Sequence, residues 1–528
     1  MTGEPTSGDP LLDIRGLSVA IGGRPVLDGV DLALRRGEVL GLVGESGSGK
    51  SMTALAIMGL LPPGAERRGQ ALLGETDLLA QDEATLCRLR GRRMGMIFQE
   101  PMTALNPLMT IGDQVAEVLR LHRGLPRAAA LAKARDRLDR VGLPGPRFHL
   151  GLWPHELSGG QRQRVAIAMA IALRPDLLIA DEPTTALDVT TQAQILDLLA
   201  GLVRDEGMGL LLITHDLAVV AGRADHVAVM QSGRVVEAGP TEALFRRRSH
   251  AYTRALFAAS THMPARHAAP DPAVPLLEVR GAVREYRLAR GALRAVDGVS
   301  LTVNAGQSVG LVGESGCGKS TLTRAILGLD PLQGGEIRLG GVPVAAGHQM
   351  PRGLRARMQV VFQDPFASFD PRWRVERLVA EPFHLTGRPP DWRARVAAAL
   401  AEVGIAPDSG KRFVHEFSGG QRQRIAIARA LIIRPALIVL DEAVSALDVR
   451  VRAQVLDLLA ALRASHGLSY LFISHDLGVV RAITDHVLVM EKGRIIEAGP
   501  TEAVLSDPQD VYTRKLLAAT PRIPDGWI

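Results

Sequence analysis

The chain has 528 residues, more than a single hydrophobic core usually serves, so we expect at least two domains. Apolar residues make up 46% of it, and its richest apolar run, the nine residues Val165 to Leu173, is too short to cross a bilayer. The N-terminus is polar and acidic, unlike a secretory signal, and two cysteines exclude a disulfide framework. We therefore expect a cytosolic protein without Cys or His metal sites or redox chemistry.

The net charge of +6 leaves nucleic acid, an anionic membrane surface or a solvated arginine-rich surface as explanations. Basic residues are scattered along the chain, and aromatic residues make up only 4% of it. A protein that binds single strands would combine positive charge with stacking aromatic side chains. We therefore interpret the charge as mainly solvated surface.

The sequence contains the same motifs twice, in the same order. GLVGESGSGKS begins at Gly41 and returns as GLVGESGCGKS at Gly310, and SGGQRQR begins at Ser158 and again at Ser418. Between the copies, residues 261–275 (THMPARHAAPDPAVP) are rich in Pro and Ala and lack apolar periodicity, which predicts an exposed linker. The repeat therefore predicts two related domains, over 1–260 and 276–528.

Short apolar runs followed by helical patterns predict the fold class. Residues 39–44, 177–181 and 209–214 are typical of buried strands, and helices are expected to begin at Lys50 and around Gln161. Strands that alternate with helices in this way predict an α/β fold with a mainly parallel sheet in each domain.

Each copy carries a phosphate-binding loop between a predicted strand and a predicted helix. In GESGSGKS and GESGCGKS the glycines let backbone N–H groups turn toward phosphate oxygens, the lysine reaches the β and γ phosphates, and the last serine coordinates Mg²⁺. One glycine-rich turn need not bind a ligand, but two copies at matching positions are specific. The candidate nucleotide-binding residues are Gly44, Ser46, Gly47, Ser48, Gly49, Lys50, Ser51, Gly313, Ser315, Gly316, Cys317, Gly318, Lys319 and Ser320.

An Asp-Glu pair ends a predicted strand in each copy, at Asp181-Glu182 and at Asp441-Glu442. The aspartate of such a pair can hold the magnesium shell while the glutamate polarises an attacking water, as phosphoryl transfer requires. An isolated pair is often only a helix N-terminus, but here each pair follows an apolar run and lies downstream of a phosphate loop. We therefore predict the two glutamates as catalytic and the two aspartates as magnesium ligands.

The SGGQ segments open predicted helices with small residues and exposed N–H groups, which suits a second contact with an anion. A serine N-cap with a Gly-Gly turn would look the same. SGGQ, however, lies about twenty residues before the Asp-Glu pair in both copies, and with the other motifs this makes nearly the whole chain resemble the ATP-binding cassette (ABC) transporter ATPases. The residues concerned are Ser158, Gly159, Gly160, Gln161, Ser418, Gly419, Gly420 and Gln421.

The resemblance implies further site residues in each copy. They are a glutamine that senses Mg²⁺ and nucleotide and faces the membrane partner, an aspartate in the D-loop, and a histidine that contacts the γ-phosphate. These residues are Gln99, Asp188 and His215 in the first copy and Gln363, Asp448 and His475 in the second. The implied magnesium ligands are Ser51, Gln99, Asp181, Ser320, Gln363 and Asp441.

The resemblance also implies two composite sites for Mg-ATP. In this family two cassettes face each other head to tail, so one site is expected to combine Lys50 with Ser418 and the other Lys319 with Ser158. Both copies retain the catalytic glutamate, so both sites are expected to hydrolyse ATP.

Loops and tails resemble the oligopeptide, dipeptide and nickel importer branch of the family. Residues 98–114 and 362–375 resemble its two ATPases, and the tails at 250–260 and 511–521 resemble the segment after its cassettes. The branch implies two permease subunits, an external solute-binding protein, no direct contact with nucleic acid, and a peripheral place on the cytoplasmic face of the inner membrane. The transported solute stays open.

Two other classes stay as alternatives. A soluble twin-cassette ATPase acting on ribosomes or nucleic acid usually joins its cassettes by a long charged helix, unlike residues 261–275 here. A fused sugar importer commonly has an altered second phosphate loop, and both loops here are intact.

Some positions depart from the pattern of the branch. The adenine-stacking aromatic is Tyr286 in the second copy but Ile21 in the first, where we expect a weaker adenine contact. The second phosphate loop has Cys317 where the first has Ser48. A thiol at a helix N-terminus beside Lys319 is expected to have a lowered pKa and raised reactivity, the alternative being a shielded, inert thiol.

Overall fold

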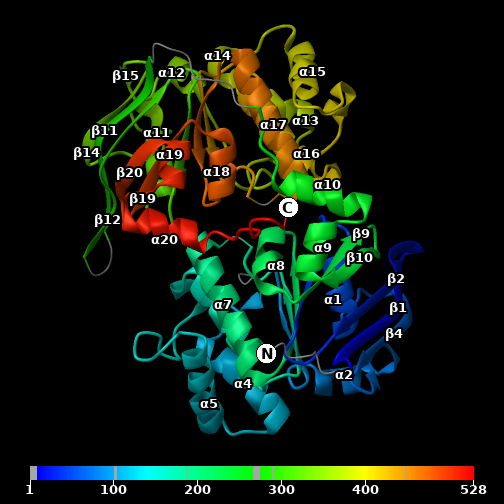
Figure 1. The fold of residues 1–528 in the computed structure, drawn as a ribbon. Coiled ribbons are helices and arrows are strands. Elements are labelled where there is room, and N and C mark those ends of the chain that lie inside the picture. Colours follow the sequence, from blue (N-terminus) through cyan, green and yellow to red (C-terminus); the bar gives the residue numbers. More distant parts are fainter. Residues whose placement is uncertain are drawn as a thin grey trace. The chain divides into compact units, whose positions relative to one another are not determined.

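The computed structural model describes residues 9–99, 104–185, 187–265, 274–287, 291–445 and 447–527 (Figure 1). The chain forms two compact units. The first comprises Met1–Leu187, Thr191–Thr261 and Pro521–Ile528, and the second comprises Asp188–Thr190 and His262–Thr520. Most of the expected linker, residues 266–273, lies outside the described part of the chain.

A six-stranded sheet forms the centre of the first unit. Its order is β10-β9-β3-β8-β7-β6, and all neighbours are parallel except β10, which runs antiparallel to β9. In that order the strands are Arg234–Pro240, His226–Gln231, Val39–Val43, Gly209–Thr214, Leu177–Asp181 and Met94–Ile97. Strands β3, β7 and β8 are buried along their whole length, as apolar strands of a covered parallel sheet should be. The α/β prediction is confirmed.

A second, antiparallel sheet accompanies it, which the sequence patterns did not predict. Its order is β2-β1-β4-β5. These strands are Arg24–Leu34, Leu12–Ile21, Glu66–Leu73 and Thr76–Asp77. One face of β1 carries Leu12, Ile14, Leu17 and Val19 into the apolar cluster that also contains β3 residues, so the two sheets share one core.

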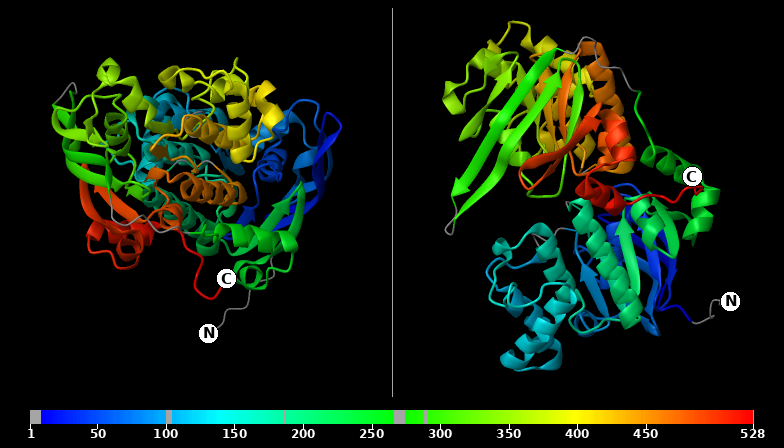
Figure 2. Two further views of the ribbon diagram at one scale, coloured as in Figure 1. Left: turned by 90° about the horizontal axis from the view of Figure 1, so that it is seen from above. Right: turned by 60° about the vertical axis from the view of Figure 1, so that its left-hand side comes forward.

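Nine helices of the first unit are described. They are α1 Lys50–Met58, α2 Glu83–Leu89, α4 Ile111–Arg123, α5 Arg127–Arg140, α6 Gly159–Ala170, α7 Val189–Glu206, α8 Leu217–Arg223, α9 Thr241–Arg247 and α10 Ala251–Ser260. Figure 2 shows α4 and α5, in cyan, on the other side of the unit from the blue antiparallel sheet. They pack with α6 and form a helical subdomain, whose apolar residues belong to a cluster that also includes one face of the core sheet.

The second unit repeats this architecture. Its core sheet has the order β16-β17-β18-β13-β19-β20, again with only the last pair antiparallel, and its second sheet has the order β12-β11-β14-β15. The core strands are Met358–Val361, Leu437–Asp441, Ser469–Ile473, Ser308–Val312, His486–Glu491 and Arg494–Pro500, and the others are Ala292–Asn304, Pro275–Arg287, Gly334–Leu339 and Val342–Pro343.

Helices pack around these sheets. They are α11 Lys319–Ile326, α12 Arg352–Ala356, α13 Val375–Val379, α14 Phe383–Thr386, α15 Trp392–Glu402, α16 Gly419–Leu431, α17 Val449–His466, α18 Leu477–Ile483, α19 Thr501–Ser506 and α20 Val511–Ala519. Among the helices the structure describes in either unit, none is both long and apolar enough to cross a membrane.

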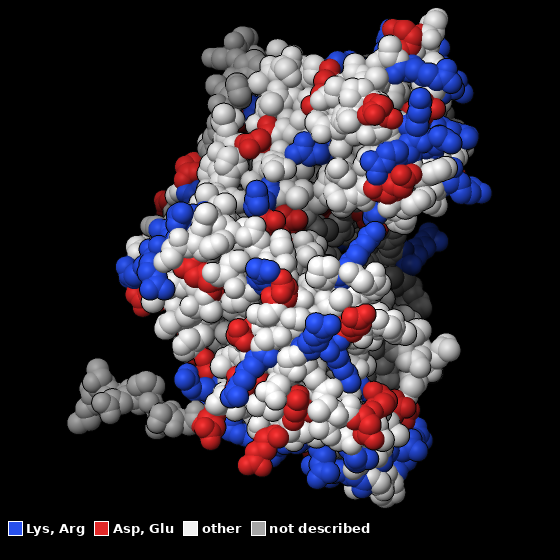
Figure 3. All heavy atoms as spheres, turned by 90° about the vertical axis from the view of Figure 1, so that its right-hand side faces the viewer, with Lys and Arg blue, Asp and Glu red and all other residues white. Residues whose placement is uncertain are grey.

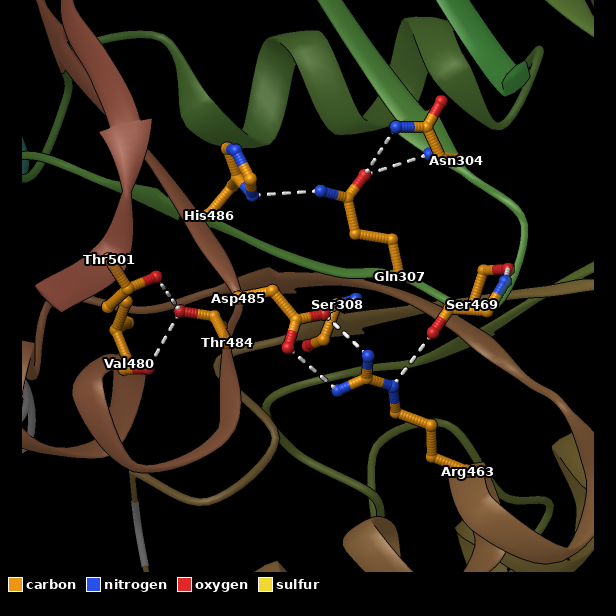
Figure 4. A network of polar contacts seen from close by, with 11 residues as sticks. Asn304, Gln307, Ser308, Arg463, Ser469, Val480, Thr484, Asp485, His486 and Thr501 are labelled. Carbon is orange, nitrogen blue, oxygen red and sulfur yellow. Dashed lines mark hydrogen bonds and ion pairs between the residues drawn. The ribbon is translucent and has the colours of Figure 1, made fainter. Parts of the chain in front are cut away.

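A polar network holds the start of β13 in the second unit (Figure 4). Arg463 of α17 has only 8% of its side chain exposed and pairs with Asp485 through two contacts of 3.1 and 2.5 Å. Asp485 also accepts the N–H of Ser308 at 2.9 Å. In the first repeat Asp225 accepts the matching N–H of Val39 at 2.8 Å, but without such an arginine, so the second unit has an added ion pair at this junction.

Candidate functional site

The loop after β3 makes a tight turn that requires glycine at two positions, because neither position has room for a side chain. Gly44 has φ +154°, and a Cβ there would lie 2.3 Å from the carbonyl oxygen of Met230. Gly49 has φ +108°, and its Cβ would lie 2.7 Å from the side chain of Leu27. Only glycine satisfies both constraints. Helix α1 begins directly afterwards, at Lys50, as predicted.

The lysine of each phosphate loop folds back over the loop. Lys50 is 6% exposed, and its Nζ donates to the carbonyl oxygens of Gly44 and Glu45, each at 2.8 Å. Lys319 makes the matching contacts in the second unit at 2.7 and 2.9 Å. An ammonium group held above a helix N-terminus makes a positive site suited to phosphate.

Ser51 and Asp181 meet at the carboxyl edge of the core sheet. Ser51 follows β3 through the loop, Asp181 ends β7, and the Ser51 hydroxyl donates to Oδ1 of Asp181 at 3.1 Å. Hydroxyl and carboxylate oxygens are ligands that Mg²⁺ prefers, with phosphate and water completing its shell. Burial raises the pKa of Asp181, which a bound cation would offset. The two residues therefore fit a magnesium ion that arrives with the nucleotide.

Two predicted residues, Gln99 and His215, and one further residue, Thr185, converge on Glu182. Its carboxylate accepts from Gln99 Nε2 at 3.0 Å and from Thr185 Oγ1 at 2.9 Å, and Nδ1 of His215 lies 3.2 Å away. Burial would raise the pKa of Glu182, but these partners, His215 first among them, outweigh it and lower the pKa to about 2. Its backbone φ of +46° is rare outside glycine, and its N–H donates to the carbonyl of Ile213 at 2.9 Å. Thr185 has no part in the sequence prediction.

The second unit has the same glutamate and histidine geometry. Glu442 has φ +50°, and Nδ1 of His475 lies 3.2 Å from its carboxylate. Burial first and then the charge of Glu442 raise the pKa of Asp441 to about 6, against the pull of Lys319. Gln363 and Asp441 line one pocket of about 640 Å³. The two copies thus place the same predicted groups at the same edge of the sheet.

The SGGQ serines cap their helices. Ser158 Oγ accepts the N–H of Gln161 at 3.4 Å, and Gln161 Oε1 accepts the N–H of Ser158 at 2.9 Å. Ser418 and Gln421 repeat this capping box at the start of α16. The side chains of both serines are at the surface. The capping box fixes the helix N-terminus, and its exposed position leaves the serine accessible to an anion.

Two family models match the chain. The model described as ABC transporter matches residues 27–185 and 296–445. The chain belongs to the ABC transporter family. A model described as the C-terminal region of oligopeptide/dipeptide transporters matches residues 236–278 and 496–528. The protein is thus an ATPase of an ABC transporter, and the predicted resemblance is confirmed.

Similar proteins cover almost the whole chain. The peptidoglycan transport ATP-binding protein YejF of Agrobacterium fabrum is 48% identical over 97% of both chains. The glutathione import ATP-binding protein GsiA is 46% identical in Salmonella typhimurium, over 97% of this chain and 89% of that one, and 46% identical in Escherichia coli, over 93% and 86%. Among solved structures, cbiO1 of Clostridium perfringens, part of the ABC transporter complex cbiONQ, matches with a TM-score of 0.41 at 28% identity, over 44% of this chain and 92% of that one.

The D-loop aspartates lie at the starts of helices, and Tyr286 contacts polar neighbours in its own unit. Asp448 caps α17 by accepting the N–H of Val451 at 3.0 Å, and Asp188 directly precedes α7. The hydroxyl of Tyr286 donates to Asp330 at 3.4 Å, and the Arg284 guanidinium lies 4.8 Å from the centre of its ring. The adenine-stacking role of Tyr286 therefore stays a prediction, with Arg284 as an added neighbour.

The expectation of a lowered pKa for Cys317 is wrong. The side chain is 7% exposed and belongs to the apolar cluster that also holds Leu311 and Met490. Burial raises the pKa of the thiol, and the nearby charge of Lys319, whose Nζ lies 3.8 Å from Sγ, does not outweigh it. The thiol points into the core beneath the loop, so the shielded alternative holds.

Proposed function

We propose that this ATPase energises an importer for peptides or related small solutes, using two composite Mg-ATP sites. The observation that carries the proposal is the pairing of two complete catalytic sets with two C-terminal segments of the oligopeptide/dipeptide type. YejF and GsiA, whose names give peptidoglycan and glutathione as cargo, support a peptide-like solute.

Glu182 and Glu442 act as the groups that orient and deprotonate the attacking water in this proposal. Each carboxylate has a lowered pKa, so it is ionised at neutral pH and can accept a hydrogen bond from the attacking water and orient it. His215 and His475 hold these carboxylates at one side and face the γ-phosphate of the substrate. Gln99, through its hydrogen bond to Glu182, links the state of the nucleotide to the loop that carries it.

The phosphates of ATP lie in the loops at Lys50 and Lys319. Ser51 and Asp181 in one site, and their counterparts in the other, would hold a magnesium ion, which would supply charge stabilisation at the transferred phosphate. Each SGGQ serine completes the site of the opposite half, Ser418 opposite Lys50.

The partners are two permease subunits and an external solute-binding protein, and the ATPase lies at the cytoplasmic face of the inner membrane. Nucleic acid is the weaker candidate, because Lys and Arg alternate with Asp and Glu over the face drawn in Figure 3 and form no continuous basic stripe there.

Disulfide crosslinking tests the composite sites. In a chain with Cys87 and Cys317 replaced by serine, Ser418→Cys paired with Ser46→Cys should form a disulfide when Mg-ATP is bound. The control pairs Ser418→Cys with Ser315→Cys in its own half and should stay uncrosslinked. Crosslinking confined to the control pair would refute the head-to-tail sites.

Transport itself is tested in proteoliposomes that contain the ATPase and its permeases. Uptake of a labelled tripeptide delivered by the binding protein should require Mg-ATP. Sugar uptake without peptide uptake would favour the sugar-importer alternative, and sedimentation of the ATPase with ribosomes but not with permeases would favour the soluble one.

A further inference from the structure

Arg429 is buried at a junction in the helical part of the second unit. It lies in the last turn of α16, with 12% of its side chain exposed. Its guanidinium donates to the carbonyl oxygen of Ser368 at 2.8 Å and to the Ser368 hydroxyl at 3.0 Å, and it lies 4.8 Å from the centre of the Phe369 ring. A longer contact of 3.4 Å reaches the carboxylate of Glu381. One side chain thus clamps one short stretch of loop.

The clamped stretch belongs to the loop that carries Gln363. This loop leaves β16 after Val361. Two turns lie within it, in which the N–H of Ser368 donates to the carbonyl oxygen of Pro365 and the N–H of Phe369 to that of Phe366. Gln363, Ser368 and Arg429 line the same pocket of about 640 Å³, together with Asp441. The pocket therefore joins the clamp to the glutamine and to the aspartate of the ATP site.

The first repeat replaces this clamp with apolar residues. Aligning Gln99 with Gln363 and Ser158 with Ser418 gives the counterparts of Ser368, Phe369 and Arg429, which are Ala104, Leu105 and Met169. Leu105 is buried in the apolar cluster of the first helical subdomain, and Met169 packs against that cluster. The counterpart side chains of the first unit therefore offer only apolar contacts, whereas the second unit has a charged, directional clamp.

Helix α16 connects the clamp to the SGGQ segment. Ser418 caps its first turn and Arg429 lies in its last, about 16 Å apart at 1.5 Å per residue. A continuous helix transmits displacement along its axis, so a loop fixed to Arg429 moves with the helix that presents Ser418.

We propose that Arg429 is a positioning residue that makes the Gln363 loop and helix α16 move as one body, through a charged clamp whose counterparts in the first unit, Ala104 and Met169, are apolar. The proposal rests on the composite sites, because there Gln363 serves one ATP and Ser418 serves the other. Arg429 then ties the two ATP sites together through the second unit, and the two units are unequal in transmitting nucleotide binding.

Hydrogen exchange of the purified full chain tests the clamp without relying on hydrolysis or transport. Arg429→Met installs the residue of the first unit, and Met169→Leu is the matched control. The amides of Ser368 and Phe369 should exchange about tenfold faster or more in Arg429→Met, because the turn opens when the clamp is gone. Arg429→Lys, which keeps the charge but not the paired donors, should lie between the two.

Steady-state kinetics give the functional readout. In Arg429→Met we expect the Gln363 loop to be in its nucleotide-binding position for only about a tenth to a third of the time. The KM for Mg-ATP should then rise about 3- to 10-fold, while kcat changes less than about twofold. Ser368→Ala, which removes one of the two hydrogen bonds, should give a smaller rise in KM and keep the fold. Unchanged exchange at residues 364–371 in Arg429→Met and in Ser368→Ala would overturn the proposal, as would faster exchange spread evenly over the whole second unit. If exchange accelerates but Ser418→Cys fails to crosslink to the first phosphate loop, the clamp stands and the composite-site proposal falls.

Discussion

Replacing the second glycine of the second SGGQ segment tests how closely α16 packs on α17. A Cβ at Gly420 would lie 2.2 Å from Cγ1 of Val451. A Cβ at Gly419, one residue earlier in the same helix turn, would meet nothing within 4 Å. Gly419→Ala is therefore a matched control for Gly420→Ala, because it adds the same methyl group without the clash.

The magnitude follows from comparing the two variants. Alanine in place of glycine favours a helix by up to about 1 kcal/mol, and this gain is common to both. The clash is not relieved by rotating Val451, because a β-branched side chain in a helix has one strongly preferred χ1 rotamer. Overpacking of this kind costs about 1–3 kcal/mol. We expect Gly420→Ala to be less stable than Gly419→Ala by that amount.

Urea unfolding of the full chain, followed by circular dichroism, measures the difference in stability between the two variants. It is expected as a shift in the midpoint of the unfolding transition of the second unit. Val451→Ala removes the clashing atom, so adding it to Gly420→Ala should cost less than it costs in the wild-type chain. Equal midpoints for Gly419→Ala and Gly420→Ala, or no relief from Val451→Ala, would refute the packing argument.

The catalytic assignments and the buried thiol give two further predictions. Glu182→Gln and Glu442→Gln should each lower the ATPase rate of the complex with permeases about a hundredfold or more at the altered site while nucleotide binding persists, since the water loses its base. Wild-type turnover in either variant would remove that glutamate from the catalytic role. Maleimide should label the exposed Cys87 of the native chain and leave Cys317 intact until the chain unfolds, as mass spectrometry of the peptides would record. Labelling of Cys317 as fast as Cys87 would contradict the burial of its side chain.

The sequence was sufficient to predict the elements that local pattern and spacing define. The buried strands at 39–43, 177–181 and 209–214 are continuous apolar runs, and each lies within a residue of its predicted bounds. Parallel strands bring their carboxyl ends to one edge, which explains why motifs that follow different strands converge. The contacts of Glu182 with Gln99 and His215 have that origin.

Features that depend on tertiary packing escaped prediction. The antiparallel sheet contains β4, whose first residues, Glu66 to Gln70, are exposed and mostly polar, so no alternating pattern marks it. Cys317 was expected to have a lowered pKa because it stands at a helix N-terminus beside Lys319, but the burial of one side chain within a loop is decided by the core that it packs against. Arg429 was overlooked because an arginine in a basic amphipathic helix has no local sign of burial.

A partly exposed carboxylate before each C-terminal helix predicts how the attachment of that helix depends on pH. Glu237 of β10 accepts the N–H groups of Ser249 and His250 at 2.8 and 3.1 Å, just before α10. Glu497 of β20 accepts two amides before α20 in the same way, at 2.8 and 3.2 Å. Desolvation opposes ionisation, but the hydrogen bonds from these amides help to outweigh it, and the pKa of Glu237 lies below its usual 4.5. The ionised carboxylate therefore fastens the helix to the sheet.

The sign of the pH effect follows from the lowered pKa. A group whose pKa is lower in the folded state stabilises that state fully above its ordinary pKa, and the stabilisation is lost as pH falls through the folded value. Glu237→Gln should therefore lower the free energy that holds α10 on the sheet by about 1 kcal/mol at pH 7. This figure allows for solvent screening of a half-exposed group. The difference from the wild type should shrink below pH 4.5 as the wild-type carboxylate takes up its proton. Limited proteolysis at residues 249–260 measures it, with Glu242→Gln as the control because Glu242 lies at the surface and holds only Arg246 of its own helix. Equal protease sensitivity of the two variants at pH 7, or a difference that grows on acidification, would contradict the carboxylate's role, since the amides before α10 would then be held by some other acceptor.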